Sequence, residues 1–249
     1  MLFRSKMATD SIPSRKDGGW SDDARGTFGW GMSASGLAAV WAAENTREAI
    51  VAAMRRREVY ATSGPRIAVR TYGGLNLLPT VLETLGFPDS IQTQAVPMGG
   101  EIMGAGVGDR FSLAIEAQAD PKSGHLDRIQ VVKGWIDASG ETQERVYDAA
   151  WSGDDRLLPD GALAAVGSSV DLNTGLTANT IGSPRLTAVW QDPEFDPAQS
   201  AFYYVRVLQI PTARHSLLDK LALGNEDIDT RRPDTIQERA YTSPIWYRP

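Results

Sequence analysis

Residues 35–64, SGLAAVWAAENTREAIVAAMRRREVYATSG, decide how the rest of the chain can fold. Residues 36–41 are a brief apolar run that has the length of a buried strand and is too short for a helix. Residues 59–62 have strand character, and the Ser-Gly-Pro sequence at 63–65 ends that second strand. A strand–helix–strand unit of this kind cannot bury its own apolar surface. The pattern therefore predicts the last unit of an α/β domain whose earlier part lies outside this chain.

The segment between the two strands has the pattern of a capped helix. Asn45 is suited to the N-cap, because its side-chain oxygen can accept a hydrogen bond from an unpaired amide of the first turn. Glu48 lies three residues on, where its carboxylate can reach back to the cap and meets the positive end of the helix dipole. Arginines at 55–57 face the negative end of the dipole in the last turn. One face is apolar at helical spacing: Ala49, Ile50, Ala53 and Met54.

The composition is that of a globular protein with enough residues for a sizeable core. The chain has 249 residues, of which 42% are hydrophobic and 22% charged. Its formal net charge of −6 disfavours non-specific binding to nucleic acid, so no nucleic-acid partner is expected. No apolar run approaches the roughly 20 residues that cross a bilayer, so no membrane partner is expected either.

Cysteine is absent, which excludes disulfides, thiolate metal sites and cysteine nucleophiles. The first residues are basic but no apolar stretch follows them, so they do not form a signal peptide. These features fit the cytoplasm and the periplasm equally well, and a periplasmic or secreted parent protein stays open. Residues up to about 31 are polar, and we interpret them as a loop whose aromatic side chains (Trp20, Phe28 and Trp30) cover a neighbouring surface.

After residue 65 the pattern changes to the period of two that half-buried strands show. Residues 66–72 alternate until the Gly73-Gly74 pair, which we expect to end the strand. Residues 75–91 suit a short amphipathic helix that two prolines limit. The clearest local prediction is a hairpin, in which residues 126–135 and 142–151 flank an Asp-Ala-Ser-Gly turn.

Further strands are predicted at 111–117, 166–172, 186–190 and 201–210, with a final edge strand in 240–247 and a helical turn at 216–223. Several short strands at this spacing suggest a β-sandwich. The expected fold class is α+β: a short α/β remnant (strand–helix–strand) packed on a mainly antiparallel β-sandwich. We expect the remnant in residues 1–72 and the sandwich in residues 73–249.

Blocks of sequence in one order along the chain carry a family resemblance. They are residues 36–50 (GLAAVWAAENTREAI), 57–66 (REVYATSGPR), 96–100 (VPMGG), 126–135 (LDRIQVVKGW), 146–148 (VYD), 201–207 (AFYYVRV) and 237–247 (QERAYTSPIWY). Together they resemble the C-terminal part of the domain-of-unknown-function family 3604. The strand–helix–strand unit and the Met-Gly step that follows also resemble the carbaryl-hydrolase-like (CehA/McbA) branch of the polymerase-and-histidinol-phosphatase (PHP) metallohydrolases.

This resemblance implies a metal-dependent hydrolase of phosphoesters or related esters, in which a distorted barrel precedes the sandwich. The family's metal ligands lie in segments rich in histidine and aspartate that come before the region seen here. This chain has only His125 and His215, which are far apart in sequence. Sites for catalytic divalent metals gather three or more protein ligands. We therefore expect no catalytic residue, metal ligand or cofactor in this chain, and a zinc or manganese ion in the full-length parent.

Two candidate substrate contacts lie in loops. Arg66 follows a Gly-Pro turn, where its guanidinium could clamp a phosphate or a carboxylate, or could brace the two domains. His215 lies just beyond the best strand candidate, where loops carry function, but a solvated or capping histidine would also fit.

Three more candidates lie on the predicted hairpin. Lys133, Trp135 and Asp148, together with Trp151, could form a ligand platform with aromatic faces for a sugar or another ring. The alternative is an aromatic cluster beside a surface ion pair.

Two functions are consistent with these patterns. In the first, the chain is the C-terminal fragment of a metal-dependent hydrolase, inactive without the barrel portion as its partner, and its substrate is a small ester. In the second, the sandwich is a non-catalytic binding or structural module for a glycan or a protein. The first predicts that Arg66 points into a cleft shared with the strand–helix–strand unit. The second predicts that Trp135 and Trp151 form an exposed patch far from that junction.

Overall fold

The computed structural model describes residues 36–83, 89–224 and 233–249. The loop interpretation of residues 1–31, with Trp20, Phe28 and Trp30, lies outside these residues. The strands are β1 (Leu37–Val40), β2 (Val59–Thr62), β3 (Ala68–Leu75), β4 (Ala95–Pro97), β5 (Glu101–Met103), β6 (Phe111–Gln118), β7 (Leu126–Ile136), β8 (Thr142–Trp151), β9 (Arg185–Gln191), β10 (Ala201–Gln209), β11 (Thr212–Ala213), β12 (Thr235–Ile236), β13 (Arg239–Thr242) and β14 (Ile245–Arg248). The helices are α2 (Arg47–Arg55) and α3 (His215–Leu223), with 3₁₀ turns at Pro79–Leu82, Asp89–Ile91 and Asp154–Arg156.

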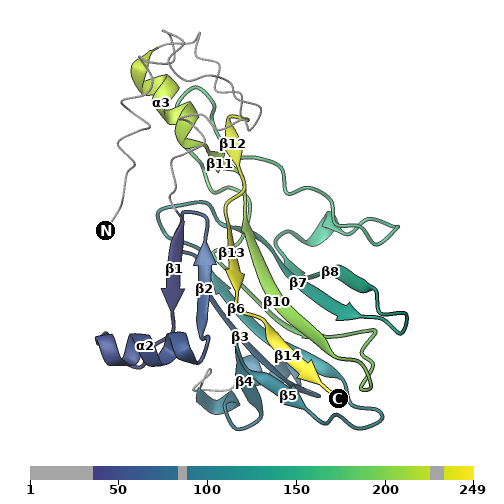
Figure 1. The fold of residues 1–249 in the computed structure, drawn as a ribbon. Coiled ribbons are helices and arrows are strands. Elements are labelled where there is room, and N and C mark those ends of the chain that lie inside the picture. The colour runs from purple at the N-terminus through teal and green to yellow at the C-terminus, as the bar shows by residue number, and fades with distance from the viewer. Residues whose placement is uncertain (1–35, 84–88, 225–232) are drawn as a thin grey trace.

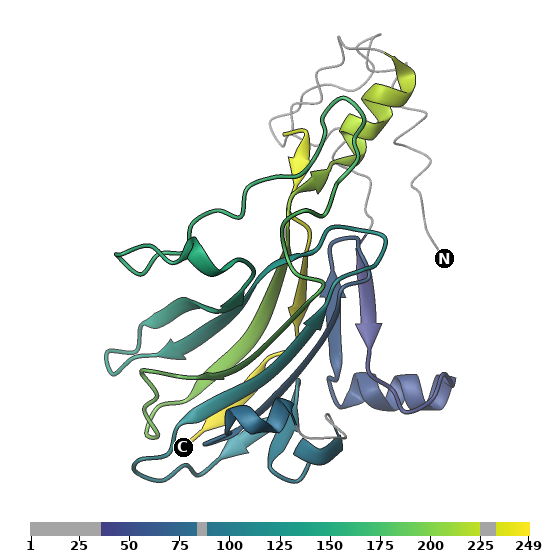
Figure 2. The ribbon, with the colours of Figure 1, turned by 180° about the vertical axis from the view of Figure 1, so that it is seen from behind.

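The predicted α+β class is confirmed: two large, mainly antiparallel sheets carry a strand–helix–strand unit at one side, and β11 pairs with β12 in a separate two-stranded sheet (Figure 1). In the larger sheet β10 is central, with β7 and then β8 on one edge. Its other edge pairs with β13 and with β14. The sheet continues from β13 through β2 to β1, and from β14 to β5. The smaller sheet has the order β4-β3-β6-β9 and lies in front in the reverse view (Figure 2).

The two sheets enclose the main hydrophobic core. Along β10 every second residue is buried, as expected for a strand with one face on a core. The smaller sheet contributes apolar side chains from β3 and β6, among them Val69, Phe111, Leu113 and Ile115. On its other face, Leu77 from the segment after β3 and Ile91 from the second 3₁₀ turn pack against Tyr72. The described residues of 75–91 form two 3₁₀ turns in place of the predicted short helix, and their apolar side chains still cover the sheet.

The strand–helix–strand unit is present, and its two strands pair antiparallel. Because β2 also pairs with β13, the unit extends the larger sheet. Trp41 attaches it to the smaller sheet: its Nε1 donates to the Val69 carbonyl at 2.8 Å, and the Arg70 guanidinium lies 3.8 Å from its ring centre. The strand at residues 36–41 was expected to be buried, but it is a partly exposed edge strand.

The helix cap differs from the prediction by one residue. Thr46, and not Asn45, is the N-cap, and its Oγ1 accepts a hydrogen bond from the Ala49 amide at 3.3 Å. Both residue types favour this position, so composition alone did not distinguish them. None of the described helices is long and apolar enough to cross a bilayer.

Three strand predictions are corrected by long-range contacts. β3 continues through Gly73, because a side chain there would lie 2.9 Å from Ile245 and only glycine allows the two sheets this approach. Residues 166–172 form no strand and make only one bridge, between Val170 and Thr177. Residues 240–247 form two interior strands and not one edge strand. Pro244 lacks an amide proton and separates β13 from β14, and both then pair with β10.

Candidate functional site

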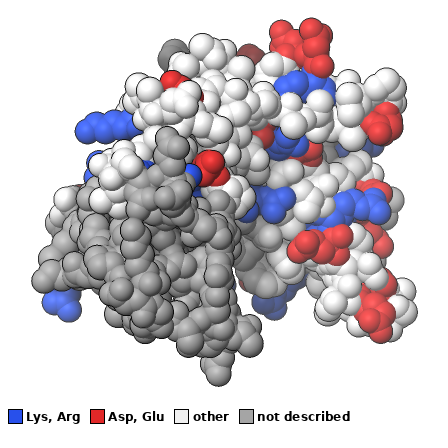
Figure 3. Space-filling model, turned by 90° about the horizontal axis from the view of Figure 1, so that it is seen from above, with Lys and Arg blue, Asp and Glu red and all other residues white. Residues whose placement is uncertain are grey.

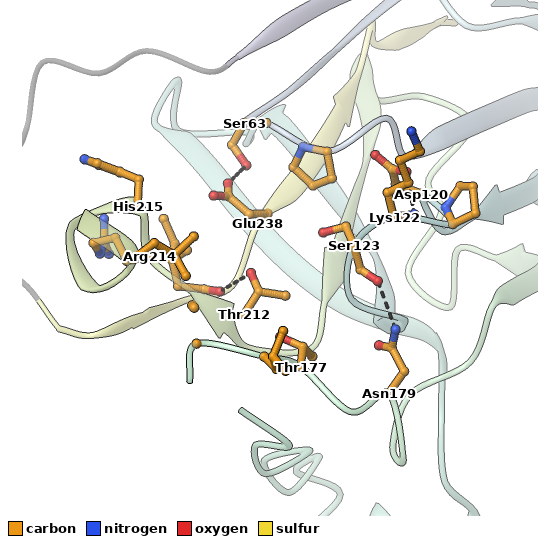
Figure 4. A pocket seen from close by; sticks show the side chains of 18 of the residues that line it. Ser63, Asp120, Lys122, Ser123, Thr177, Asn179, Thr212, Arg214, His215 and Glu238 are labelled. Atoms are coloured by element: carbon orange, nitrogen blue, oxygen red, sulfur yellow. Dashed lines mark hydrogen bonds between the residues drawn. The ribbon is translucent and has the colours of Figure 1, made fainter. Parts of the chain in front are cut away.

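A cavity of about 880 Å³ lies at the end of the sandwich where β10 finishes (Figure 4). Its wall includes residues 63–65 from the β2–β3 turn and residues 120–123 from the β6–β7 turn. The rest of the wall is formed by residues 175–177, Asn179, residues 212–215, Gly36, Leu218, Ile236 and Glu238. The strand–helix–strand unit and the sandwich loops therefore share one cavity. Its volume is within the range of small-molecule sites in proteins.

Asn179 fixes one wall of this cavity. Its Oδ1 accepts a hydrogen bond from the His125 amide at 2.9 Å, and its Nδ2 donates to the Ser123 carbonyl at 3.0 Å. The backbone of Asn179 has a φ of 51°, a left-handed conformation that asparagine tolerates better than most residues. Gly175, with a φ of 72°, packs against Leu218 of α3, where a side chain would collide. These contacts hold the β8–β9 connection against the β6–β7 turn and α3.

The two carboxylates in the wall serve the loops themselves. Asp120 accepts hydrogen bonds from the amides of Arg66 at 2.8 Å and Lys122 at 2.9 Å. Glu238 accepts a hydrogen bond from the Ser63 hydroxyl, and the same hydroxyl accepts one from the Arg239 amide at 2.9 Å. The acidic groups are thereby occupied in shaping the cavity.

Two positively charged residues, Arg214 and Lys122, line the cavity, and His215 lies beside Arg214. Arg214 and His215 lie on one side, and Lys122 on the other (Figure 4). The Arg214 Nε donates to the Pro233 carbonyl at 3.0 Å, which leaves its two terminal nitrogens for other contacts. His215 is the first residue of α3, whose N-terminus has no side-chain cap. Amides at the start of a helix and cationic side chains both favour an anion.

The cavity end of the molecule carries no large field of one sign. Where the described residues are visible from this end, lysine and arginine alternate with aspartate and glutamate (Figure 3).

The structure separates the five sequence-predicted site residues. His215 lines the cavity, and Arg66 lies at its edge through the hydrogen bond of its amide to Asp120. Lys133 and Trp135 lie together, with the Lys133 Nζ 5.1 Å from the ring centre of Trp135. Asp148 lies elsewhere, on the face of the larger sheet away from the core, and its Oδ1 accepts a hydrogen bond from the side-chain Nε2 of Gln130 at 2.8 Å. The hairpin residues do not form a single platform.

Lys133 is a buried residue whose ammonium group makes two hydrogen bonds. Its Nζ donates to Asp192 Oδ2 at 2.6 Å and to the Glu194 carbonyl at 2.9 Å. The Tyr203 hydroxyl donates to the same Asp192 oxygen at 2.7 Å. Burial, followed by the nearby Asp192 charge, raises the pKa of Tyr203 far above its usual value. Nearer the surface, burial and a hydrogen bond to Glu194 raise the pKa of Tyr147 to about 12.

The family model for "Protein of unknown function (DUF3604)" matches residues 2–249. The chain belongs to this family. No curated protein and no solved structure matches it.

Among residues 36–83, 89–224 and 233–249, no three His, Cys, Asp or Glu side chains are close enough together to hold a metal ion. The donor set of the described residues thus does not fit a divalent metal.

Several cavity residues of the DUF3604 chain were not predicted as site residues, chiefly Lys122, Asn179, Arg214 and Glu238. Lys122 lies in an Asp-Pro-Lys-Ser turn and Arg214 in the loop that follows β10. Both positions had a usable signal, because polar residues in turns after strands often contact ligands. Asn179 and Glu238 carried no such signal, since their roles depend on partners more than 50 residues away in sequence.

Proposed function

We propose that this chain is part of a metal-dependent hydrolase of the PHP type that acts on phosphoesters or related esters. The cavity at the end of the sandwich binds the anionic part of the substrate. The observation that carries the proposal is the shared wall: residues 63–65 of the strand–helix–strand unit face sandwich loops that bring Lys122, Arg214 and His215. A guanidinium beside a helix N-terminus is suited to a phosphate or carboxylate.

In this proposal the described residues bind and orient the ester and do not hold the metal. A zinc or manganese ion would be held by a barrel portion outside the described residues, where it would supply a metal-activated water. The contribution of Arg214 and Lys122 is to fix one end of the substrate, so that its ester group faces the barrel. Positioning of this kind can account for a large part of an enzyme's rate enhancement.

Titration calorimetry of the purified chain with inorganic phosphate and phenyl phosphate tests the binding step. Arg214→Gln should weaken binding of both about tenfold, because a charge-assisted hydrogen bond contributes roughly 1.5–3 kcal/mol. The matched control is Arg145→Gln. Arg145 is an exposed arginine paired with Glu194, outside the cavity wall, and its loss should leave binding unchanged.

A second assay tests the placement of the metal. The chain with added manganese or zinc should hydrolyse p-nitrophenyl phosphate, bis(p-nitrophenyl) phosphate and p-nitrophenyl acetate no faster than a metal-free blank. Turnover that depends on metal would overturn the assignment of the metal to another part of the protein. Equal phosphate binding by the wild type and both variants, or no binding at all, would overturn the assignment of the cavity.

A further inference from the structure

A second hollow, a groove of about 670 Å³, lies at the other end of the larger sheet, where β7 ends and β10 begins. The cavity described above adjoins the end of β10, so the two sites occupy opposite ends of that strand. Three partly or largely exposed aromatic residues, Trp135, Phe202 and Trp246, line the groove, and so do the buried Tyr247 and the exposed Arg248. We call these three residues and the polar groups beside them the aromatic groove.

The register of the sheet places the key residues in one row. Glu144 is opposite Gly134, Gly134 is opposite Phe202, and Phe202 is opposite Trp246. Residues directly opposite each other on neighbouring strands share a face of the sheet. The row therefore presents a carboxylate, a gap and two aromatic rings in succession.

Gly134 creates the gap in this row. A Cβ at that position would collide with the ring of Phe202, so the ring lies directly on the backbone of β7. The ring centres of Phe202 and Trp246 are 5.3 Å apart. Trp246 is 39% exposed, whereas its neighbours Ile245 and Tyr247 are buried in the core. The indole of Trp246 on β14 is therefore partly exposed to solvent and is not part of the core.

Polar groups from β8 border the rings. Thr142, Gln143 and Glu144 all line the groove. No hydrogen bond or ion pair joins the Glu144 carboxylate to another residue in the described part of the chain. At the other end of the row, Glu101 forms an ion pair with Arg248.

This combination selects a class of ligand. An acyl chain would cover the rings but would remove water from the Glu144 carboxylate without replacing its hydrogen bonds, which is unfavourable. An anionic ligand would be repelled by the same carboxylate, and the Arg248 guanidinium that also lines the groove is already paired with Glu101. A neutral sugar fits both parts: its C–H face stacks on aromatic rings, and its hydroxyl groups donate hydrogen bonds to a carboxylate or an amide oxygen. The groove volume lies in the range of small-molecule sites.

We propose that the aromatic groove binds a neutral oligosaccharide, with Phe202 and Trp246 stacking on a sugar ring and Glu144 accepting hydrogen bonds from its hydroxyl groups. This site is independent of the ester cavity. It would attach the protein to a glycan, or hold a glycan-bearing substrate, at the end remote from Arg214.

The proposal is tested by titrating the purified chain with cellohexaose, maltohexaose and N-acetylchitohexaose. Binding is measured by tryptophan fluorescence and by calorimetry. At least one hexasaccharide should bind and shift the tryptophan emission. Trp246→Ala should weaken that binding about tenfold through loss of stacking, and Glu144→Gln should weaken it severalfold. Neither side chain belongs to the main hydrophobic core, so both variants should remain folded, as circular dichroism would verify.

Two matched controls should bind as the wild type does. Trp151→Phe alters a tryptophan at the far end of β8, and Glu83→Gln removes an exposed carboxylate outside the groove. The proposal is overturned if no hexasaccharide binds at about 10 mM, a limit near −3 kcal/mol of binding free energy. Binding that Trp246→Ala leaves unchanged would also overturn it. Tighter binding of 1-octanol than of any sugar would overturn the proposal as well. A dimer that is seen by light scattering and that Trp246→Ala dissociates would also overturn it. None of these outcomes affects the phosphate titration of the cavity.

Discussion

Replacement of Lys133 by methionine separates a structural role from a substrate-binding role for this residue. The side chains of Lys133 and Asp192 are 3% and 0% exposed, and their charged atoms are 2.6 Å apart. Methionine nearly preserves the volume of the side chain but removes the charge. Asp192 would keep hydrogen bonds from the Tyr203 hydroxyl and the Glu194 amide and lose its cation.

The expected loss of stability follows from this geometry. At an effective dielectric constant of about 20, two unit charges 2.6 Å apart attract by about 6 kcal/mol. Part of this attraction is offset by the cost of removing both groups from water, so the net effect of breaking the pair is roughly 3–5 kcal/mol. For a protein of this size, that loss lowers the melting temperature by roughly 6–20 °C.

The assay is urea unfolding followed by tryptophan fluorescence, on the wild type, Lys133→Met, Asp192→Asn and the double variant. The double variant removes both charges and should be more stable than the sum of the single losses predicts, by at least about 2 kcal/mol. A Lys133→Met loss below about 1 kcal/mol, or strictly additive losses, would refute the buried ion pair. Phosphate affinity measured well below the melting temperature should not change, because Lys133 lies outside the cavity.

Three further outcomes are expected. Arg156→Ala removes a 2.7 Å ion pair to the buried Asp127, so it should lower the free energy of unfolding by about 2–4 kcal/mol. It should also expose the β8–β9 connection to limited proteolysis. The control Arg145→Ala, at an exposed ion pair, should lower the free energy of unfolding by less than about 1 kcal/mol. The pKa of Tyr147 is raised to about 12 in the folded protein, against 10.0 normally. The stability that its protonated hydroxyl contributes is therefore complete below pH 10 and is lost as the pH rises through about 12. Tyr147→Phe should flatten the fall of the free energy of unfolding between these pH values, measured by urea titrations at alkaline pH. Asn179→Ala removes two hydrogen bonds to the neighbouring turn, so it should lower the free energy of unfolding by about 1–3 kcal/mol and weaken phosphate binding. Calorimetry that shows wild-type stability and phosphate affinity would count against the role of Asn179 in the cavity wall.

Local patterns in the sequence identified most of the individual elements. The alternation in residues 111–117 and the turn between β7 and β8 act over a few residues, so the strand and the hairpin could be recognised without the rest of the fold. The same holds for α2, whose apolar spacing and flanking strands were predicted, with an error of one residue at the cap.

Only the tertiary structure decided how these elements pair and which side chains meet. The antiparallel pairing of β1 with β2, and the position of β13 and β14 beside β10, depend on partners far away in the chain. Lys133 occurs in an alternating strand and could have faced either side; it became a core residue because Asp192, 59 positions later, meets it between the sheets. The cavity combines loops that start near Ser63, Asp120 and Arg214, and no local signal links them. Periodicity reports which face of a strand is apolar, whereas the composition of a site depends on which strand ends the sheets bring together.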